Sequence, residues 1–285
     1  MEEQQLTKKS KYKKYLRWIV VCLVCVGIGF GISSLVTTSY TTYTDYEDVY
    51  ADPSCNVAGI NLHGSMLTYL PLHADGDTNF DYDTVSSEDV LWYIQSANNN
   101  QNIKSIVFEI DSVGGSPVAG EEIANAIKNS EKPVVGFIRE SGLSAAYWAI
   151  SGADKIWASK NSDVGGIGVT MSYLNNVENN KKEGYTYEQL SSGKFKDSGT
   201  PDLPLTKEEK DLFMRDINII HQNFMEAVSV NRNIPLEEVK KFADGSSVLG
   251  DKAKELGLID EIGGINEVQD YLKEQLGEEP NICWQ

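Results

Sequence analysis

The sequence predicts an α/β domain preceded by one N-terminal transmembrane helix. From about residue 56, short apolar runs alternate with helical patterns, as is typical of α/β architecture. Ahead of this part, residues 18–36 form an apolar run without a charged side chain. The 285 residues, 41% of them hydrophobic, suffice for one large domain with a substantial core.

Residues 18–36 have the length of a membrane span. At ~1.5 Å per residue they reach about 28 Å, close to the hydrocarbon thickness of a bilayer. Lys and Arg flank only their N-terminal side, so residues 1–17 are expected to be a cytoplasmic head and the bulk of the chain to lie outside the cell membrane. No Ala-x-Ala-like site follows, which favours an uncleaved single-pass anchor over a cleaved signal peptide. The polar residues 37–55 are expected to form a stalk.

The charge of the chain is unevenly distributed. Residues 1–17 hold six basic side chains against two acidic ones, a net charge of +4. Since the whole chain carries −17, the remainder carries −21. An acidic bulk with a short basic head argues against nucleic acid as a partner. The acidic excess also has a plain interpretation, which is solubility.

The four cysteines fall into two groups. Cys22 and Cys25 lie in the apolar run, where a thiol behaves as a small apolar side chain. Cys55 and Cys283 stand at opposite ends of the remaining chain, and an oxidising compartment would let them form a disulfide. The sequence alone leaves that pairing open. No metal-type spacing of cysteines exists.

The main domain is expected to span residues 56–277, followed by a tail at 278–285. Its periodicity predicts strands at residues 57–62, 103–110, 134–138 and 155–158. It predicts helices at residues 86–98, 117–129, 145–151, 207–231, 236–243, 251–256 and 265–276, with short extended links at 245–249 and 258–260. Ser87 is the expected N-cap of the first helix, and Ser116 with Pro117 at N1 begins the second.

Gly114 and Gly115 follow a buried strand and precede a helix. Two glycines at such a place let backbone N–H groups point at one spot, where they can bind an anion or the oxyanion of acyl transfer. An ordinary tight turn between a strand and a helix explains the same residues, and by themselves they favour that interpretation.

Ser144 lies between a predicted strand and a predicted helix. Its hydroxyl is then expected at a helix N-terminus, where the Ala145 N–H can join the oxyanion donors. Ala145 and Ala146 keep the surroundings small enough for a substrate carbonyl. The alternative is an N-cap serine without a chemical role.

Lys196 follows in a polar segment rich in Gly, Ser and Asp. A serine is a weak nucleophile unless a base takes its proton, and a lysine that folding desolvates can be that base. Lys194 competes for the role two positions away. Taken alone, either lysine is more simply explained as a solvated surface residue.

The order of these motifs resembles the signal peptide peptidase A (SppA) family of membrane-anchored Ser–Lys serine proteases, part of the Clp protease/crotonase superfamily. The resemblance covers about residues 56–270. Its most specific stretches are residues 106–115, 141–158, 165–169 and 193–201. It implies a spiral of ββα units in which Ser144 is the nucleophile and Lys196 the general base. It also implies an oxyanion hole built from Gly114 or Gly115 with Ala145, and it leaves Lys194 outside the pattern.

The resemblance also implies a function. Relatives are endopeptidases that cleave remnant signal peptides and other membrane-proximal peptides without a cofactor. They assemble into rings, and in relatives of this half-size kind the serine and the lysine come from neighbouring subunits. We therefore expect peptide substrates, a membrane attachment and a homo-oligomer.

Two departures from the family pattern stand near the serine. Ala145 and Ala146 replace two small residues that are mostly glycine. Gly166 replaces a serine whose hydroxyl would help to orient the lysine. Ser162 and Thr170 are the candidates to supply that hydroxyl instead.

Other classes of protein share some of these features. Residues 142–146 resemble the nucleophile elbow of an α/β-hydrolase, which needs a later histidine. The histidine after the serine is His221, on the expected packing face of the 207–231 helix, where a structural role is the simpler explanation. A crotonase-like enzyme would need CoA, to which an outward-facing domain has little access. A ring-forming scaffold of the same fold, weakly active or inactive, is a further alternative, against which the presence of both Ser144 and Lys196 argues.

Overall fold

The computed structural model describes residues 49–70 and 84–285. The predicted cytoplasmic head, the anchor at 18–36 and most of the predicted stalk lie outside these residues. Within them, no helix is both long enough and apolar enough to cross a membrane.

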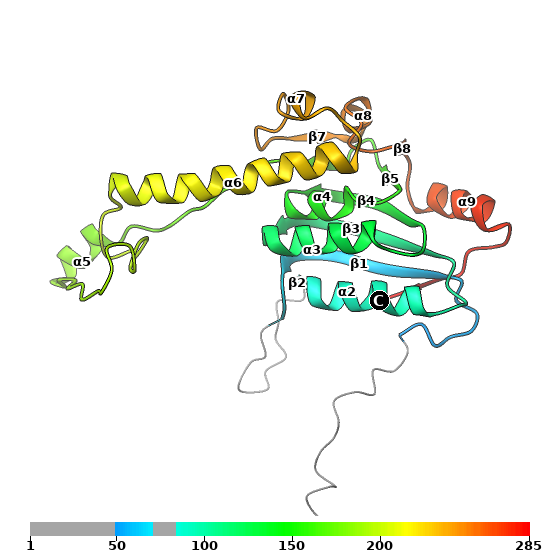
Figure 1. The fold of residues 1–285 in the computed structure, drawn as a ribbon, viewed down its shortest axis with the longest axis horizontal. Coiled ribbons are helices and arrows are strands. Elements are labelled where there is room, and N and C mark those ends of the chain that lie inside the picture. Colours follow the sequence, from blue (N-terminus) through cyan, green and yellow to red (C-terminus); the bar gives the residue numbers. More distant parts are fainter. Residues whose placement is uncertain (1–48, 71–83) are drawn as a thin grey trace, which may run out of the picture. The chain divides into compact units, whose positions relative to one another are not determined.

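One mostly parallel sheet organises the described domain (Figure 1). Its strands are β1 (Val57–Leu67), β2 (Thr84–Ser86), β3 (Ser105–Gly115), β4 (Val134–Leu143), β5 (Lys155–Ala158), β6 (Asp163–Gly165), β7 (Ser247–Leu249), β8 (Glu261–Ile262) and β9 (Ile282–Trp284). The main path runs β2-β1-β3-β4-β5-β8 with parallel pairing throughout. Strand β6 pairs with β4, β7 runs antiparallel to β6, and β9 pairs with β1. The predicted α/β class is therefore confirmed.

Helices cover both faces of this sheet. They are α2 (Ser87–Asn99), α3 (Pro117–Lys128), α4 (Ala145–Ile150), α5 (Val177–Glu183), α6 (Lys207–Asn231), α7 (Leu236–Val239), α8 (Gly250–Glu255) and α9 (Ile265–Leu276). Alternate strand residues face opposite sides, so the central strands β1, β3, β4 and β5 contribute to two clusters. On one side, Ile60, Ile106 and Ile138 belong to the main core, together with residues of α2, α3, α4 and the end of α6. On the other side, Val107 and Val135 join a smaller cluster with α9.

Local capping explains where several helices begin. Ser116 accepts a hydrogen bond from the Ala119 N–H, and Pro117 opens α3, as predicted. Helix α6 has the predicted bounds and starts with a capping box between Thr206 and Glu209. The N-cap of α2 is Ser86, not Ser87 as predicted, because Ser86 Oγ accepts from the Asp89 N–H. Ser87 is buried, and its hydroxyl donates to Glu122 instead.

The structure has elements that the pattern did not predict. Strands β3 and β4 continue to Gly115 and Leu143, beyond their apolar runs, because the ladder extends along the polar ends. Strands β2, β6 and β9 and helix α5 are short and lack a clear period. The residues expected to be a tail, 278–285, include β9, which continues the sheet beside β1.

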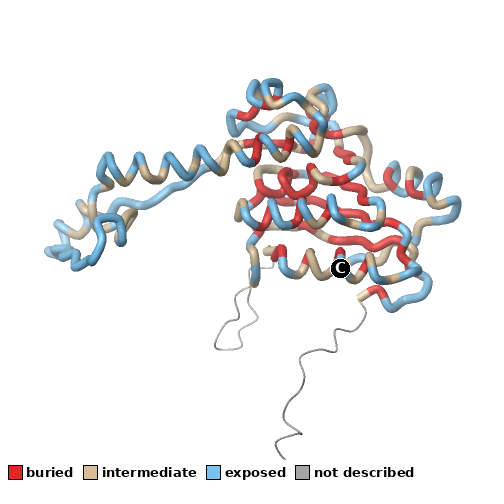
Figure 2. The backbone as a smooth tube through the Cα atoms, in the orientation of Figure 1, coloured by how far each residue is buried: buried red, intermediate tan, exposed pale blue. Residues whose placement is uncertain are grey.

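Residues 171–219, which we call the arm, contain no buried residue. The arm includes α5 and the first half of α6, and it projects from the sheet (Figures 1 and 2). Buried residues of α6 occur only near its C-terminal end, at Phe224, Met225 and Val228. This end alone attaches the helix to the core.

A disulfide between Cys55 and Cys283 closes the domain, with the two Cα atoms 5.9 Å apart and a sequence separation of 228. Hydrogen bonds reinforce the closure, since the Asn281 side chain donates to the Ser54 carbonyl and the Gln285 N–H donates to the Gly59 carbonyl. The pairing that the sequence left open is thus present in the structure.

Replacing Cys283 by serine should lower the free energy of unfolding by roughly 2–5 kcal/mol, because the crosslink restricts a very long loop in the unfolded chain. Urea unfolding of residues 49–285 measures this difference. A reducing agent should destabilise the wild type to the same extent and leave Cys283→Ser unchanged. A wild type whose unfolding midpoint does not respond to the reductant would contradict the prediction.

Candidate active site

Ser144 lies in a strained turn between β4 and α4. Its backbone has φ 52° and ψ −126°, a conformation that a residue with a side chain rarely adopts. The turn is fixed on both sides, since the Ser144 N–H donates to the Gly165 carbonyl at 2.8 Å and its carbonyl accepts from the Trp148 N–H at 2.9 Å. The side chain makes no capping hydrogen bond to α4. The interpretation of Ser144 as an ordinary N-cap therefore does not describe this serine.

Gly114 packs directly against the Ser144 turn. A Cβ atom on Gly114 would lie 2.9 Å from both the Ala145 nitrogen and the Ser144 Cβ, and its φ of +99° also favours glycine. The end of β3 and the turn after β4 are thus in contact, as expected for neighbouring parallel strands. The Gly114 N–H, however, donates to the Ser112 hydroxyl at 3.0 Å.

The other two predicted donors of the oxyanion hole lie beside the serine. Gly115 and Ala145 line the same pocket as Ser144. The Ala145 N–H is at the first position of α4, where a helix leaves its N–H groups without an intrahelical acceptor. The arrangement suits an oxyanion beside Ser144. The roles of Gly114, Gly115 and Ala145 stay predictions.

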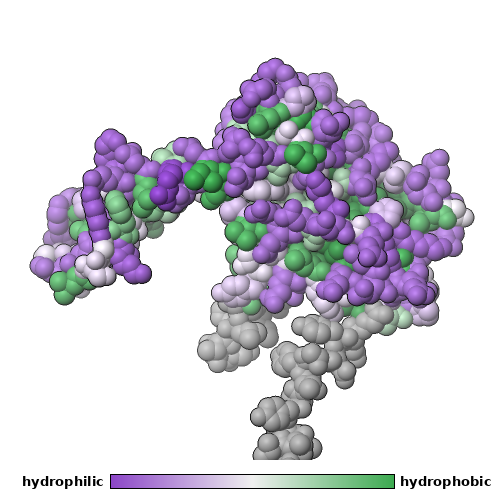
Figure 3. All heavy atoms as spheres, in the orientation of Figure 1, coloured by the Kyte–Doolittle hydropathy of each residue, from purple (hydrophilic) through white to green (hydrophobic). Residues whose placement is uncertain are grey.

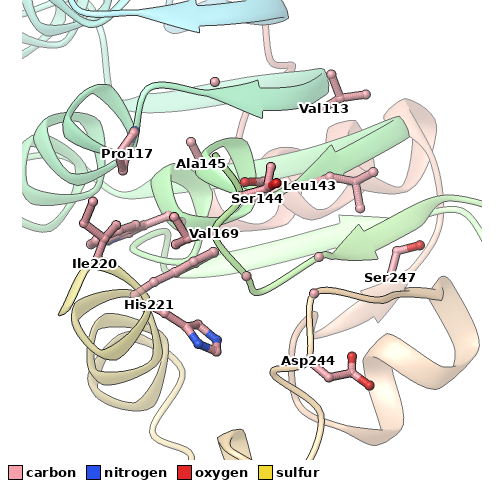
Figure 4. A pocket seen from close by; sticks show the side chains of 17 residues that line it. Val113, Pro117, Leu143, Ser144, Ala145, Val169, Ile220, His221, Asp244 and Ser247 are labelled. Atoms are coloured by element: carbon pink, nitrogen blue, oxygen red, sulfur yellow. The ribbon is translucent and has the colours of Figure 1, made fainter. Parts of the chain in front are cut away.

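The pocket at Ser144 has a volume of about 690 Å³ (Figure 4). Its walls come from the ends of β3 and β4, from residues 166–170, from α6 and from the segment before β7. Most of the wall is apolar, including Val113, Leu143, Val169 and Ile220. Polar groups at its edge include Asp244, and hydrogen bonds from the Ser246 hydroxyl and N–H hold the pKa of this carboxyl below its ordinary value. This cleft has the size and polarity to accept part of a peptide.

One aromatic contact positions the α6 wall. Trp148, on α4, stacks on Phe224, on α6, with the ring centroids 4.8 Å apart and the planes 6° from parallel. Both side chains are almost completely buried. His221 lies one helical turn before Phe224 and lines the Ser144 pocket. A histidine that the sequence analysis judged to be structural thus lines the same pocket as the candidate nucleophile.

The structure does not bring Lys196 to Ser144 within one chain. Lys196 is on the arm and lines a different pocket, of about 470 Å³, with Tyr187, Leu190 and Asp197 among its neighbours. The arm segment that holds it packs on the start of α6, where Gly199 lies against Phe213. From Lys207 to Phe224, α6 is about 25 Å long at ~1.5 Å per residue. Lys196 therefore lies near the start of α6, whereas the Ser144 pocket lies against the C-terminal part of the same helix.

Lys194 and Lys196 differ in whether they form an ion pair. Lys194 Nζ forms an ion pair with Glu208 at 2.7 Å, which holds this side chain on α6. Lys196 is exposed and makes no ion pair with the described residues. Lys196 is thus the lysine of this segment that stays available to another group.

The structure separates the two hydroxyls considered as substitutes near Gly166. Ser162 is buried, and its hydroxyl donates to the carbonyl of Arg139 outside the Ser144 pocket. Thr170 lines the pocket. A Cβ on Gly166 would lie 3.4 Å from the Ser144 nitrogen, so a small side chain has room there, although the φ of +58° disfavours it.

Three residues line the Ser144 pocket that the sequence analysis did not assign to it: Asp244, Ser247 and His221. The helical spacing contained a signal for His221, because Ile220 and Phe224 on either side of it mark the face of α6 that packs on α4. Asp244 and Ser247 are distant in sequence from Ser144, and only the pairing of β7 with β6 brings their segment to the pocket.

Comparison with known proteins identifies the family to which this chain belongs. The family model of Peptidase family S49 matches residues 126–278. The chain belongs to this family. A protease-named protein of Methanocaldococcus jannaschii is 34% identical over 181 residues, which are 62% of this chain and 58% of that protein. An Enterococcus faecium protein provisionally named signal peptide peptidase SppA is 29% identical over 280 residues, 91% of this chain and 80% of that protein.

The resemblance to the SppA family is therefore confirmed. The family model covers α4 and the Ser144 turn as well as the arm with Lys196. Among solved structures, a ClpP1 mutant from Listeria monocytogenes aligns with a TM-score of 0.46 and 16% identity, over 72% of this chain and 91% of that one.

Replacing Gly114 by alanine should destabilise the domain by about 2–4 kcal/mol, since the new methyl group meets the backbone of the Ser144 turn at a positive φ. Thermal or urea unfolding measures the loss. Gly184→Ala is the matched control, because Gly184 also has a positive φ, of +81°, but nothing lies within 4 Å of its Cβ position. The control should cost about 1 kcal/mol. Equal losses in the two variants would show that the contact with the Ser144 turn contributes nothing.

Proposed function

We propose that this protein is a serine endopeptidase in which Ser144 is the nucleophile and Lys196 of a neighbouring copy is the general base. The observation that carries the proposal is the strained turn that presents an uncapped Ser144 hydroxyl to a peptide-sized pocket. Membership of peptidase family S49 supports the reaction class.

The chemistry needs few groups. Neutral Lys196 Nζ takes the Ser144 proton while Oγ attacks a peptide carbonyl, and the Ala145 N–H with a glycine N–H stabilises the oxyanion. The resulting ammonium then gives the proton to the leaving amine. A water molecule activated by the lysine releases the acyl group and regenerates the hydroxyl. The Ser144 proton thus leaves with the amine, and the water molecule supplies the hydroxyl group of the new acid and, through Lys196, the proton that restores Ser144, so the cycle balances.

The arm supports a division of the site between copies. None of its residues 171–219 is buried, and several of its apolar side chains are exposed, as the green atoms along the arm illustrate (Figure 3). Leu190 is 98% exposed and Leu174 is 79% exposed. An apolar surface of this kind on an ordered segment indicates a packing partner. A second copy that buries the arm would also remove Lys196 from water, which favours the neutral amine that a base requires.

We further propose that the domain folds as a Clp protease/crotonase-like spiral of ββα units and that its copies assemble into a closed homo-oligomeric ring. A contact in which the arm of one copy meets the Ser144 pocket of the next is heterologous, and repetition of such a contact generates a ring when the rotation between copies closes.

The proposed location is the cell membrane, with the N-terminus in the cytoplasm and the catalytic domain outside. The uncharged run at residues 18–36 and its basic flank support this orientation. The Cys55–Cys283 disulfide also fits an oxidising compartment. Remnant signal peptides are the proposed substrates, because apolar peptides near a membrane match both the anchor and the apolar wall of the pocket.

A Ser–His hydrolase is a second candidate, favoured by the position of His221 in the Ser144 pocket. His221 Nε2, however, has no hydrogen-bond partner among the described residues, Ser144 included. An inactive scaffold of the same fold is the non-enzymatic alternative. Both alternatives predict mutational results that differ from those of the Ser–Lys protease.

Substitution of either dyad residue should abolish peptide hydrolysis by the full chain. Ser144→Ala and Lys196→Ala are each expected to lower kcat by at least about a thousandfold, because nucleophile and base act as one unit. Lys194→Ala is the matched control and should stay within about threefold of wild type, since Lys194 pairs with Glu208. Release of new amines from apolar, signal-peptide-like peptides measures the rate. Full activity of Lys196→Ala would exclude the dyad, and an inactive but assembled wild type would favour the scaffold.

Mixing the two inactive variants should restore activity. Each working site then combines Ser144 from one copy with Lys196 from its neighbour, so an equal mixture that exchanges subunits restores about one site in four. The measurement is the hydrolysis rate after dissociation and joint reassembly of Ser144→Ala with Lys196→Ala. If both variants assemble together and the mixture stays inactive, the two residues of a site do not come from different copies.

A further inference from the structure

His221 contains an unpaired polar atom in the Ser144 pocket. Its Nε2 atom is buried and has no hydrogen-bond partner among the described residues. The residue as a whole is only partly buried, and its side chain lines the pocket (Figure 4). An imidazole nitrogen always has a hydrogen bond to give or accept, and leaving it unpaired in a buried place is costly. This atom therefore indicates a ligand group that occupies the pocket.

The position of His221 is firmly set. Ile220, the preceding residue, packs on the main core, and Phe224 stacks on Trp148 of α4 one turn later. These contacts lock this part of α6 to the helix that begins after Ser144. The part of α6 that carries His221 is consequently held in place on one wall of the cleft, as the support of a group that orients a substrate must be.

The lining of the Ser144 pocket defines the chemistry of the ligand. Val113, Leu143, Val169 and Ile220 make the lining largely apolar, so the ligand presents an apolar side chain to them. A peptide amide offers both an N–H donor and a carbonyl acceptor, and it therefore satisfies either tautomer of a neutral imidazole. An extended peptide with an apolar residue combines the two features.

We propose that His221 Nε2 hydrogen-bonds the backbone amide of a bound peptide whose apolar side chain lies against the apolar lining of the pocket. The inference rests on the proposed function, because it names a contact made by the substrate of the Ser144 site. In this role His221 binds and orients the peptide and takes no proton from Ser144. The unpaired state of Nε2 agrees with this role, since a base prepared for Ser144 would be expected to accept its hydroxyl.

Binding to an inactive protein tests the proposal without relying on catalysis. The full chain carrying Ser144→Ala is titrated with a fluorescent, apolar, signal-peptide-like peptide, and anisotropy measures Kd. Adding His221→Phe keeps an aromatic ring but removes the hydrogen bond, and it should weaken binding about tenfold. Adding His221→Gln retains a donor and an acceptor and should stay within about threefold. His63→Phe is the control, because His63 is a partly exposed histidine that does not line the pocket.

Kinetics with Ser144 present separates binding from proton transfer. His221→Phe should raise KM about tenfold, with kcat and the rate of labelling by a small phosphonate near those of wild type. A large loss of kcat and of labelling at constant KM would assign His221 to proton transfer and overturn the proposal. Unchanged peptide binding in Ser144→Ala/His221→Phe, or no binding by Ser144→Ala itself, would overturn it as well.

The same measurements distinguish the two proposals. If the wild type does not hydrolyse the peptide, but Ser144→Ala binds it in a way that depends on His221, the proposed protease activity fails and the peptide contact stands. If the wild type hydrolyses the peptide and the His221 variants match it in Kd and KM, only the contact fails.

Discussion

The close contact between Gly114 at the end of β3 and the Ser144 turn after β4 is the constraint on which the site depends. There is no room for a Cβ on Gly114, and Ser144 itself has a positive φ. The Gly165 carbonyl holds the same turn from the other side. Three neighbouring strand ends thus fix where α4 begins. The start of α4 places Trp148, and its stack with Phe224 sets the end of α6 and one wall of the pocket.

The attachment of α6 is concentrated at its C-terminal end. Beyond the Trp148–Phe224 stack, Arg232 forms an ion pair with Asp260 at 2.9 Å, and only 6% of the Arg232 side chain is exposed. Asp260 also accepts a hydrogen bond from the Ile156 N–H of β5. Nearby, the Tyr147 hydroxyl donates to the Leu258 carbonyl, and burial raises the pKa of Tyr147 well above its ordinary value, so it remains a neutral donor. The helix is therefore held rigidly at its C-terminal end, while its N-terminal half, which is part of the arm, contains no buried residue.

Local signals predicted much of this fold. The bounds of α6 and α9 follow from strong amphipathic periods with a capping box or a terminal glycine, and Ser116 with Pro117 defines the start of α3. The meeting of Gly114 with Ser144 was also predictable, because parallel strands end at one edge of a sheet.

Other features depend on contacts between distant residues. Strand β9 exists because the Cys55–Cys283 bond and β1 hold it, and residues 282–284 have no periodicity of their own. His221 could be assigned to a packing face, but only the tertiary structure shows that this face ends at the pocket. The distance between Ser144 and Lys196 was hidden for the same reason, since it depends on the direction in which α6 leaves the core.

The one-sided attachment of α6 has a consequence for how such a protein would be regulated. In the proposed enzyme, a helix that carries Lys196 away from Ser144 of the same copy would leave an isolated copy without its base. The fraction of complete sites would then rise steeply with the density of copies in the membrane and fall on dilution. Newly made, scattered molecules would be harmless to the proteins around them, and proteolysis would begin only where enough copies gather. The length of one exposed helix would thus act as a concentration threshold, without an inhibitor or a removable pro-segment.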